Sequence, residues 1–272
     1  MDRTLRDQLV RDDLDQRDAG YVAAMIPVLG RIMKLYFRSE VHGMDRLPAE
    51  GGALIVSNHS GGLMAMDVPI IAAAFVEEFG PHRPLYVLAH DVLLNNPAGA
   101  FFRRCGFLAA NRDNADAVLS SGAVTIVFPG GDYDVARPTA KANVIDFGGR
   151  TGYVRTALDN GVPIVPVVSI GGQEAQLHLS RGATIAKVTG IASRFRFPYV
   201  PVSVGFPFGL SFGFPPNLPL PTKITTQVLD PVDVAAEFGP DPDVAEVDEA
   251  VRGRMQDALD ELKRRRRFPV LG

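Results

Sequence analysis

The chain has 272 residues, a formal net charge of −3 at pH 7, 46% hydrophobic residues and 22% charged residues. This composition is ordinary for a globular protein and excludes a disordered chain, and the small net charge gives no indication of nucleic-acid binding. The length allows one large or two small domains, and we expect one. The single cysteine, Cys105, cannot form an internal disulfide or build a metal site alone, which favours a reducing compartment.

Residues 1–39 are predicted to form helices. Residues 4–18 have a polar helical pattern, and residues 21–37 have helical spacing with a broad apolar face that must pack on a core or lie at a lipid interface. Pro27 kinks this second helix or marks its start. The first residues lack the apolar core of a secretion signal, and no apolar stretch is long enough to span a membrane. We therefore expect a cytoplasmic protein at the inner face of the membrane.

Residues 40–242 are predicted to form the main domain. A short edge strand and a turn are expected at residues 41–48. Further strands are expected at 53–56, 85–89, 107–110, 124–128 and 164–170. Helical patterns lie between them at 67–78, 114–121 and 151–160. Strands that alternate with helices predict an α/β fold with a mostly parallel central sheet flanked by helices.

Two further segments have a distinct composition. Residues 195–221 contain seven aromatic residues and seven prolines, which predicts an apolar loop without regular structure, either a lid over the core or a surface for an acyl chain or a bilayer. Residues 243–272 are predicted to pack on the same domain through a charged helix that ends in five basic residues. These cations either complement the helix dipole or attract anionic lipid.

The most informative stretch runs from the strand at 53–56 into Asn58 and His59. Gly61 and Gly62 permit a tight turn, and Asp67 opens the next predicted helix, so the turn could fold Asp67 back towards His59. A carboxylate on the second imidazole nitrogen orients the ring and makes it more basic, which is what activating a hydroxyl requires. The alternative is a pair that only satisfies a strand-to-helix turn.

A second stretch, residues 125–138, ends a strand in Pro-Gly-Gly. Such a turn lets a ligand approach the backbone closely, and its N–H groups could cradle an anion or an oxyanion. Asp132, Asp134 and Arg137 follow it, and a solvated acidic rim is the alternative interpretation. Arg150 opens another predicted helix, where a cation opposes the dipole, which indicates a specific carboxylate or phosphate partner.

Two other kinds of site are disfavoured. The nucleophile elbow of α/β-hydrolase esterases, Gly-x-Ser-x-Gly, does not occur in the sequence. The remaining histidines lack ligand spacing with carboxylates or with Cys105, so no metal site is expected.

These blocks resemble the glycerolipid acyltransferase superfamily, which contains 1-acylglycerol-3-phosphate acyltransferase. Residues 57–60 (Ser-Asn-His-Ser) are similar to its first block and residues 106–112 to its second. Residues 128–131 (Phe-Pro-Gly-Gly) look like the third block and residues 162–167 like the fourth. The resemblance covers roughly residues 40–230, with all four blocks in order.

The sequence departs from this family at two places. The family's aspartate usually lies five positions after the histidine, but Met64 stands there, so its role is transferred to Asp67. The third block normally has glutamate before its last glycine and an arginine nearby, where this chain has Gly130 and Tyr133. These differences argue against glycerol phosphate acceptors and favour the diacylglycerol acyltransferase-like branch, whose acceptors are neutral lipids or alcohols.

The resemblance implies an O-acyltransferase of lipid metabolism that uses acyl-CoA or acyl-ACP and needs no further cofactor or metal. His59 would act as general base on an acceptor hydroxyl, and Asp67 would hold its imidazole. Backbone N–H groups near Gly61 and Gly62 or near the third block would stabilise the oxyanion. The expected substrate-binding residues are Gly61, Gly62, Arg112, Phe128, Pro129, Gly130, Gly131, Asp132, Arg137 and Arg150.

Two other functions stay open at this point. A thioesterase or lipid hydrolase would use water in place of the acceptor. A non-catalytic protein that binds acyl lipids would explain the changes in the third block as lost chemistry. Peripheral association with a membrane is expected in the leading interpretation, through residues 21–37, residues 195–221 and the basic C-terminal run.

Overall fold

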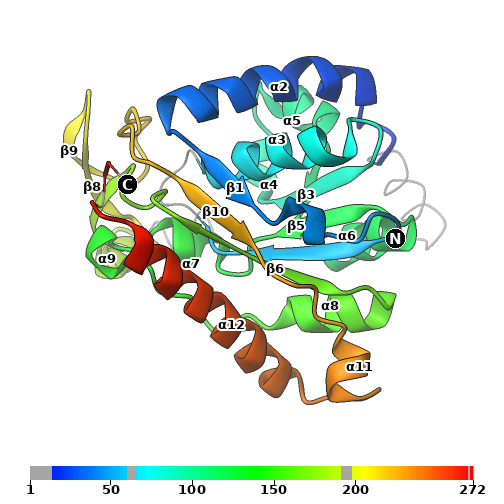
Figure 1. Ribbon diagram of the computed structural model, residues 1–272. Coiled ribbons are helices and arrows are strands. Elements are labelled where there is room, and N and C mark those ends of the chain that lie inside the picture. The colour runs from blue at the N-terminus through cyan, green and yellow to red at the C-terminus, as the bar shows by residue number, and fades with distance from the viewer. Residues whose placement is uncertain (1–13, 60–64, 191–197, 269, 272) are drawn as a thin grey trace.

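A seven-stranded sheet forms the centre of the computed structural model, which describes residues 14–59, 65–190, 198–268 and 270–271 (Figure 1). The strand order is β1-β10-β6-β2-β5-β3-β4. The strands are β1 (Glu40–His42), β2 (Ala53–Ser57), β3 (Leu85–Ala89), β4 (Phe107–Ala109), β5 (Val124–Val127), β6 (Ile164–Ile170) and β10 (Thr225–Val228). Every neighbouring pair is parallel except β10 with β6, so the predicted α/β fold with a mostly parallel sheet is confirmed.

The central strands are covered on both faces, which explains their continuous apolar sequences. Every residue of β2 and β6 is buried. Because successive side chains of a strand point to opposite faces, Leu54 and Val56 join one core cluster, and Ala53 and Ile55 join the other. The first cluster is completed by the lower helices of Figure 1 and the second by the helices above the sheet.

The longer helices of these layers lie close to their predicted positions, whereas the short helices at 91–94, 99–104 and 234–238 were not expected from the sequence. Above the sheet in Figure 1 are α2 (Ala19–Tyr36), α3 (Asp67–Phe79), α4 (Asp91–Leu94) and α5 (Gly99–Arg104). Below it are α8 (Gly152–Asn160), α11 (Val234–Phe238) and α12 (Val244–Arg265). The remaining helical elements are η1 (Met44–Arg46), α6 (Arg112–Ser120), α7 (Gly131–Val135), η2 (Thr139–Lys141) and α9 (Ala183–Val188).

The helix expected at residues 21–37 is observed as α2, but it begins two residues earlier and well before Pro27. The Asp18 side chain accepts a hydrogen bond from the Tyr21 N–H and caps the helix, which then continues through Pro27. Pro27 therefore does not mark the helix start, and residues 17 and 18 do not belong to a polar helix. Residues 4–13 lie outside the described part of the chain. The division of the chain at residues 40 and 243 stays a prediction.

The prediction that residues 195–221 lack regular structure is wrong for the described part, residues 198–221. A second sheet contains β7 (Leu177–Ser180), β8 (Val202–Gly205) and β9 (Gly209–Phe212), paired antiparallel in that order. Its prolines lie outside the strands: Pro201 precedes β8 and Pro207 lies in the turn between β8 and β9. Four-residue strands fit between such prolines, and the count of prolines alone could not reveal this. Residues 195–197 are outside the described residues.

The C-terminal helix α12 packs its apolar side on the core, with Val251, Met255 and Leu259 fully or almost fully buried. The ion pair between Arg266 and Glu174 joins the end of this helix to the segment after β6. Among the described residues, no helix is both long and apolar enough to cross a membrane.

Candidate active site

The candidate site lies where β2 and β5 end. The two strands are parallel neighbours with Val56 opposite Val127, so their carboxyl ends meet at one edge of the sheet. β2 leads into Asn58 and His59, and β5 leads into Phe128 and the Pro-Gly-Gly turn. Open α/β sheets bind ligands at this edge.

His59 and Asp67 lie together at the end of β2 and the start of α3. Asp67 is the first residue of α3 and is fully buried, and its Oδ2 lies 2.8 Å from Nδ1 of His59. The His59 side chain remains 15% exposed, and its ring stacks on that of Phe128 with centroids 4.2 Å apart. The imidazole is therefore held on one edge by a carboxylate and on one face by an aromatic ring.

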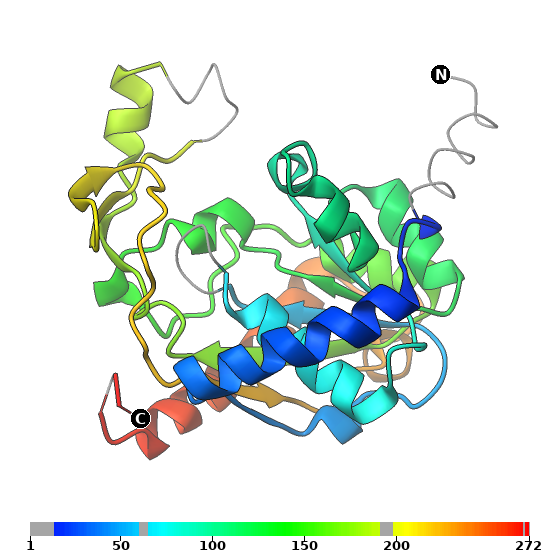
Figure 2. The same cartoon turned by 90° about the horizontal axis from the view of Figure 1, so that it is seen from above.

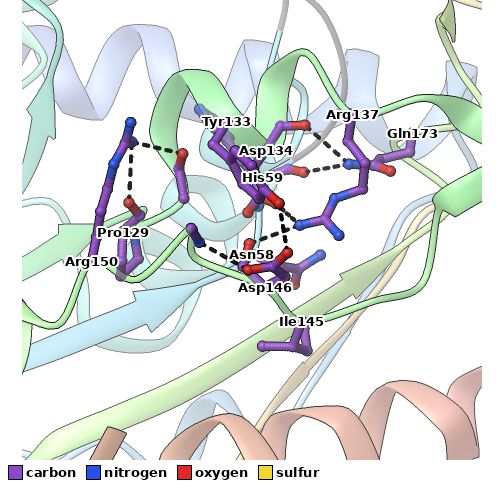
Figure 3. A network of polar contacts seen from close by, with 12 residues as sticks. Asn58, His59, Pro129, Tyr133, Asp134, Arg137, Ile145, Asp146, Arg150 and Gln173 are labelled. Atoms are coloured by element: carbon purple, nitrogen blue, oxygen red, sulfur yellow. Dashed lines mark hydrogen bonds and ion pairs between the residues drawn. The ribbon is translucent and has the colours of Figure 1, made fainter. Parts of the chain in front are cut away.

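A second carboxylate approaches His59 from α7, just after the third block. Asp134 lies in α7, and its Oδ2 accepts a hydrogen bond of 3.3 Å from the His59 backbone N–H. Its other oxygen forms a buried ion pair with Arg137, whose guanidinium also donates to the Asp146 carbonyl at 2.8 Å (Figure 3). His59 is thus flanked by two buried aspartates.

The electrostatics of the site follow from this arrangement. Burial of the imidazole lowers the pKa of His59, but the charges of Asp67 and Asp134 and the hydrogen bond to Asp67 more than offset it, so the pKa lies above its ordinary value. Burial raises the pKa of the Asp134 carboxyl, against the effects of Arg137 and the His59 N–H. The imidazole is accordingly a stronger base than one exposed to water.

Hydrogen bonds between side-chain amides and the backbone fix the position of this segment. Asn58 exchanges two bonds with Ser169 of β6, donating to the carbonyl at 2.9 Å and accepting from the N–H at 2.8 Å. Gln173, which follows β6, donates to the carbonyls of His59 at 3.4 Å and Asp134 at 3.3 Å (Figure 3). Together with His59 and Asp134, these residues line a small hollow beside the imidazole.

The chain is similar in sequence to other proteins over much of its length. A family model described as Acyltransferase matches residues 38–170. The Bos taurus protein named "DGAT1/2-independent enzyme synthesizing storage lipids" is 28% identical over 194 residues, 70% of this chain and 55% of that protein. An uncharacterized protein of Mycobacterium tuberculosis is 32% identical over 255 residues, 92% of this chain and 68% of that protein. The chain belongs to the glycerolipid acyltransferase superfamily.

The fold of this acyltransferase is also similar to a solved structure. The crystal structure of the 1-acyl-sn-glycerophosphate (LPA) acyltransferase from Thermotoga maritima matches with a TM-score of 0.56 and covers 90% of this chain and 82% of that chain. The sequence identity is 19%, so the likeness shows the fold alone.

The third block of this acyltransferase is held by Arg150. Its Nη1 donates to the Gly130 carbonyl at 2.8 Å and to the Pro129 carbonyl at 3.4 Å, and its Nη2 pairs with Asp132 (Figure 3). Arg150 lies two residues before α8 and therefore does not oppose the dipole in its first turn. The carboxylate partner expected from the sequence is Asp132. The Gly131 N–H donates to the Phe128 carbonyl at 3.0 Å and is committed to the turn.

The geometry explains why glycine stands at position 130, where the family usually has glutamate. A Cβ added to Gly130 would lie 2.4 Å from Oδ2 and 2.5 Å from Cγ of Asp134. The Asp134 carboxylate therefore occupies the space that a side chain at position 130 would enter. Asp134 lies four residues after Gly130, and its carboxylate stands beside position 130.

The other predicted arginines differ in their surroundings. Arg112 begins α6 and is 61% exposed, and it pairs with Asp159 of α8 and Asp116 of its own helix, not with the His59 segment. Arg137 is buried and pairs with Asp134. It borders a cavity of about 310 Å³ that Tyr133, Asp146 and the basic residues Lys141 and Arg181 also line.

Several residues at this edge were missed by sequence reasoning. Gln173 follows β6 and Arg181 follows β7. Of the two, only Gln173 could have been found from the sequence, because it lies just after the fourth block. The role of Asp134 next to His59 depends on pairing between β2 and β5, which spacing does not give. Gly61 and Gly62 lie outside the described residues. Within the ranges that the structure describes, no three His, Cys, Asp or Glu side chains gather closely enough to hold a metal ion.

Proposed function

We propose that this acyltransferase moves a fatty acyl group from an acyl thioester, either acyl-CoA or acyl-ACP, to a hydroxyl of a lipid or another alcohol. The observation that carries the proposal is the pair of His59 and Asp67, with Nδ1 and Oδ2 2.8 Å apart at the carboxyl edge of the sheet. A buried carboxylate on one nitrogen leaves the other, Nε2, to accept the proton of an acceptor hydroxyl.

The proposed reaction begins when Nε2 of His59 removes the hydroxyl proton while the hydroxyl oxygen attacks the thioester carbonyl. A new C–O bond forms, and the carbonyl oxygen becomes an oxyanion. Collapse of this tetrahedral intermediate breaks the C–S bond and expels a thiolate, which takes the proton back from the imidazolium. The products are the ester and the free thiol, so the enzyme ends in its starting protonation state.

Asp67 has two roles in this proposal. It accepts a hydrogen bond from Nδ1–H and so selects the tautomer that has Nε2 free as a base, and its negative charge stabilises the imidazolium formed during attack. Asp134 adds a second negative charge near the same ring and holds the His59 backbone. We assign Asp134 as a positioning residue, because its contact is with the backbone of His59.

The oxyanion requires donors that the turn at residues 128–131 supplies only in part. The Gly131 N–H is bonded within the turn, so the Gly130 N–H and those near Gly61 and Gly62 are the proposed donors. A well-placed donor contributes about 3 kcal/mol in acyl-transfer enzymes. Phe128, through its stacking on His59, keeps the ring edge aligned with this turn.

Phosphate groups of the donor or the acceptor headgroup are proposed to bind near the cavity beside Tyr133. Lys141 and Arg181 line it without the buried aspartate partner that holds Arg137. Arg112 and Arg150 each pair with an aspartate, and Asp132 is the partner of Arg150. Among the predicted and observed cations, Lys141 and Arg181 therefore fit this role better.

The test is a product analysis with purified protein, long-chain acyl-CoA or acyl-ACP, and a panel of diacylglycerol, long-chain alcohol and lysophosphatidate acceptors. An ester whose formation requires the acceptor supports the proposal. Free fatty acid as the sole product with every acceptor would identify a hydrolase. Water could reach His59 for that reaction, because its side chain is partly exposed. Acyl-chain binding without turnover with either donor would identify a binding protein. With a lipid acceptor the proposed reaction would take place at a membrane surface. The cytoplasmic location stays a prediction.

A further inference from the structure

The three-stranded sheet β7-β8-β9 has its polar face inside and its apolar face outside. The strand register places Leu177, Val204 and Leu210 side by side, and the next row is His178, Ser203 and Ser211. Because neighbouring rows point to opposite faces, these two sets lie on different sides of the sheet. His178 and Ser203 are each 3% exposed, whereas Leu210 and Phe212 are each 64% exposed.

The turn between β8 and β9 continues this surface. Phe206 is 73% exposed and Phe208 is 53% exposed. We call Leu177, Val204, Phe206, Phe208, Leu210 and Phe212 the hairpin surface. A soluble monomer rarely exposes so many large apolar side chains together, and a sheet that buries serine and histidine while exposing leucine and phenylalanine indicates an apolar partner outside.

The charge of the surrounding chain identifies the kind of partner. No acidic residue occurs between Glu174 and Asp230, and this segment contains Arg181, Lys187, Arg194, Arg196 and Lys223. Lys187 and the 82% exposed Val188 lie together on α9, directly after β7. Apolar side chains accompanied by cations and free of carboxylates complement an anionic lipid surface.

The three-stranded sheet is in contact with the segment around α7, which carries Asp134. The Thr139 hydroxyl in η2 donates to the Gln176 carbonyl at 3.1 Å and accepts from the His178 N–H at 2.9 Å, so β7 is joined to the segment after α7. The Arg181 guanidinium lies 3.8 Å from the ring centroid of Tyr133, the neighbour of Asp134. Figure 2 shows the hairpin at a corner of the molecule, standing away from the central sheet.

We propose that the hairpin surface docks on a bilayer that contains anionic lipid. The side chains from Phe206 to Phe212 enter the interface between headgroups and acyl chains, and Lys187 contacts the headgroups. The bilayer then lies against the element that borders the cavity at Tyr133. This inference rests on the surface and not on the proposed chemistry, because vesicle binding needs neither donor nor acceptor.

The experiment is flotation of the full chain with vesicles made of equal parts phosphatidylcholine and phosphatidylglycerol. The double variant Leu210→Ser with Phe212→Ser is expected to lower the partition coefficient at least about tenfold, because two large apolar side chains no longer enter the interface. Val92→Ser, at a valine of α4 that is also exposed, is the matched control and is expected to bind as the wild type does. Binding to vesicles of phosphatidylcholine alone is expected to be weaker, and raised salt to weaken binding to the anionic vesicles.

Each contrary outcome overturns the proposal. Wild-type protein that stays with neither vesicle excludes it. Equal flotation of the hairpin variant and the wild type, with loss of binding instead in Ile32→Ser with Leu35→Ser, would place the lipid contact on α2. If the wild type is a dimer that does not bind vesicles, and the hairpin variant is a monomer, the partner of the hairpin surface is a second copy of the chain. Melting temperatures equal to the wild type establish that the variants are folded.

Discussion

The substitution Gly130→Ala tests the packing of the third block directly. The new methyl group would lie 2.4 Å from the nearest carboxylate oxygen of Asp134 and 2.9 Å from its Cβ, closer than atoms in a folded protein approach. Asp134 cannot simply turn away, because it is 2% exposed and bonded to both Arg137 and the His59 N–H. The segment around α7 must therefore shift.

The expected cost follows from this overlap. Adding a methyl group to a well-packed interior destabilises by about 1–3 kcal/mol. In a chain of this size each kcal/mol lowers the melting temperature by roughly 2–4 °C, so Gly130→Ala is expected to melt about 2–12 °C below the wild type. The shift also moves Asp134 away from His59, so activity is expected to fall in the fraction that remains folded.

The assay is thermal unfolding followed by circular dichroism, with Gly152→Ala as the matched control. Gly152 begins α8 and has no atom within 4 Å of an added Cβ, so alanine there is expected to be neutral or to stabilise by a few tenths of a kcal/mol. Asp134→Ala removes the overlapping carboxylate and is expected to cost less in the Gly130→Ala background than in the wild type. Equal melting of the wild type and Gly130→Ala would refute the packing argument.

Three further results are expected. Burial alone lowers the pKa of His59 and the Asp67 carboxylate raises it, so Asp67→Asn should lower that pKa and move the acid limb of the kcat/KM profile to lower pH, with a rate loss of about a hundredfold; an unmoved limb would contradict this. Arg137→Leu leaves Asp134 buried without its counter-charge and should destabilise the protein by about 3–5 kcal/mol in urea unfolding. Arg112→Gln breaks exposed ion pairs and should change stability by less than about 1 kcal/mol. Similar effects of the two substitutions would disprove the distinction between the buried and the exposed ion pairs. Burial raises the pKa of the Cys105 thiol to about 11, so a disulfide reagent at pH 8 should label the native chain far more slowly than the unfolded one.

Much of the fold could be predicted because local sequence and tertiary context agree. The buried strands β2, β5 and β6 are continuous apolar runs, and helices with clear caps or apolar faces separate them. The strand order was not accessible, since β10 enters the sheet between β1 and β6 from a part of the chain far beyond either. Such pairing is decided by contacts that are distant in sequence.

The failure at residues 198–221 has a different physical cause. Sequence patterns assume that apolar residues face a core, but β8 and β9 turn theirs outward and bury Ser203. The many prolines of this segment also suggested an absence of strands, although the prolines lie outside the strands. A sheet with its apolar face outside can be recognised only when the fold shows which of its faces is covered.

The candidate site was predictable where its residues lie close together in the sequence. The spacing of His59, a two-glycine turn and Asp67 was sufficient to predict that the two side chains could meet, and their atoms lie within hydrogen-bonding distance. The change at Gly130 was visible in the sequence but its meaning was not, because the compensating carboxylate of Asp134 is placed by the turn of α7. The contact of Gln173 with the same segment also depends on neighbouring strands.

The measurement that tests the central claim most directly is acceptor-stimulated thiol release from long-chain acyl thioester by wild-type protein and His59→Gln at matched concentration and confirmed folding. Glutamine keeps a polar side chain but cannot accept and return a proton near neutral pH. The account predicts that the stimulated rate falls by at least about a hundredfold in the variant. An unchanged rate in His59→Gln would contradict the role of His59 as the general base.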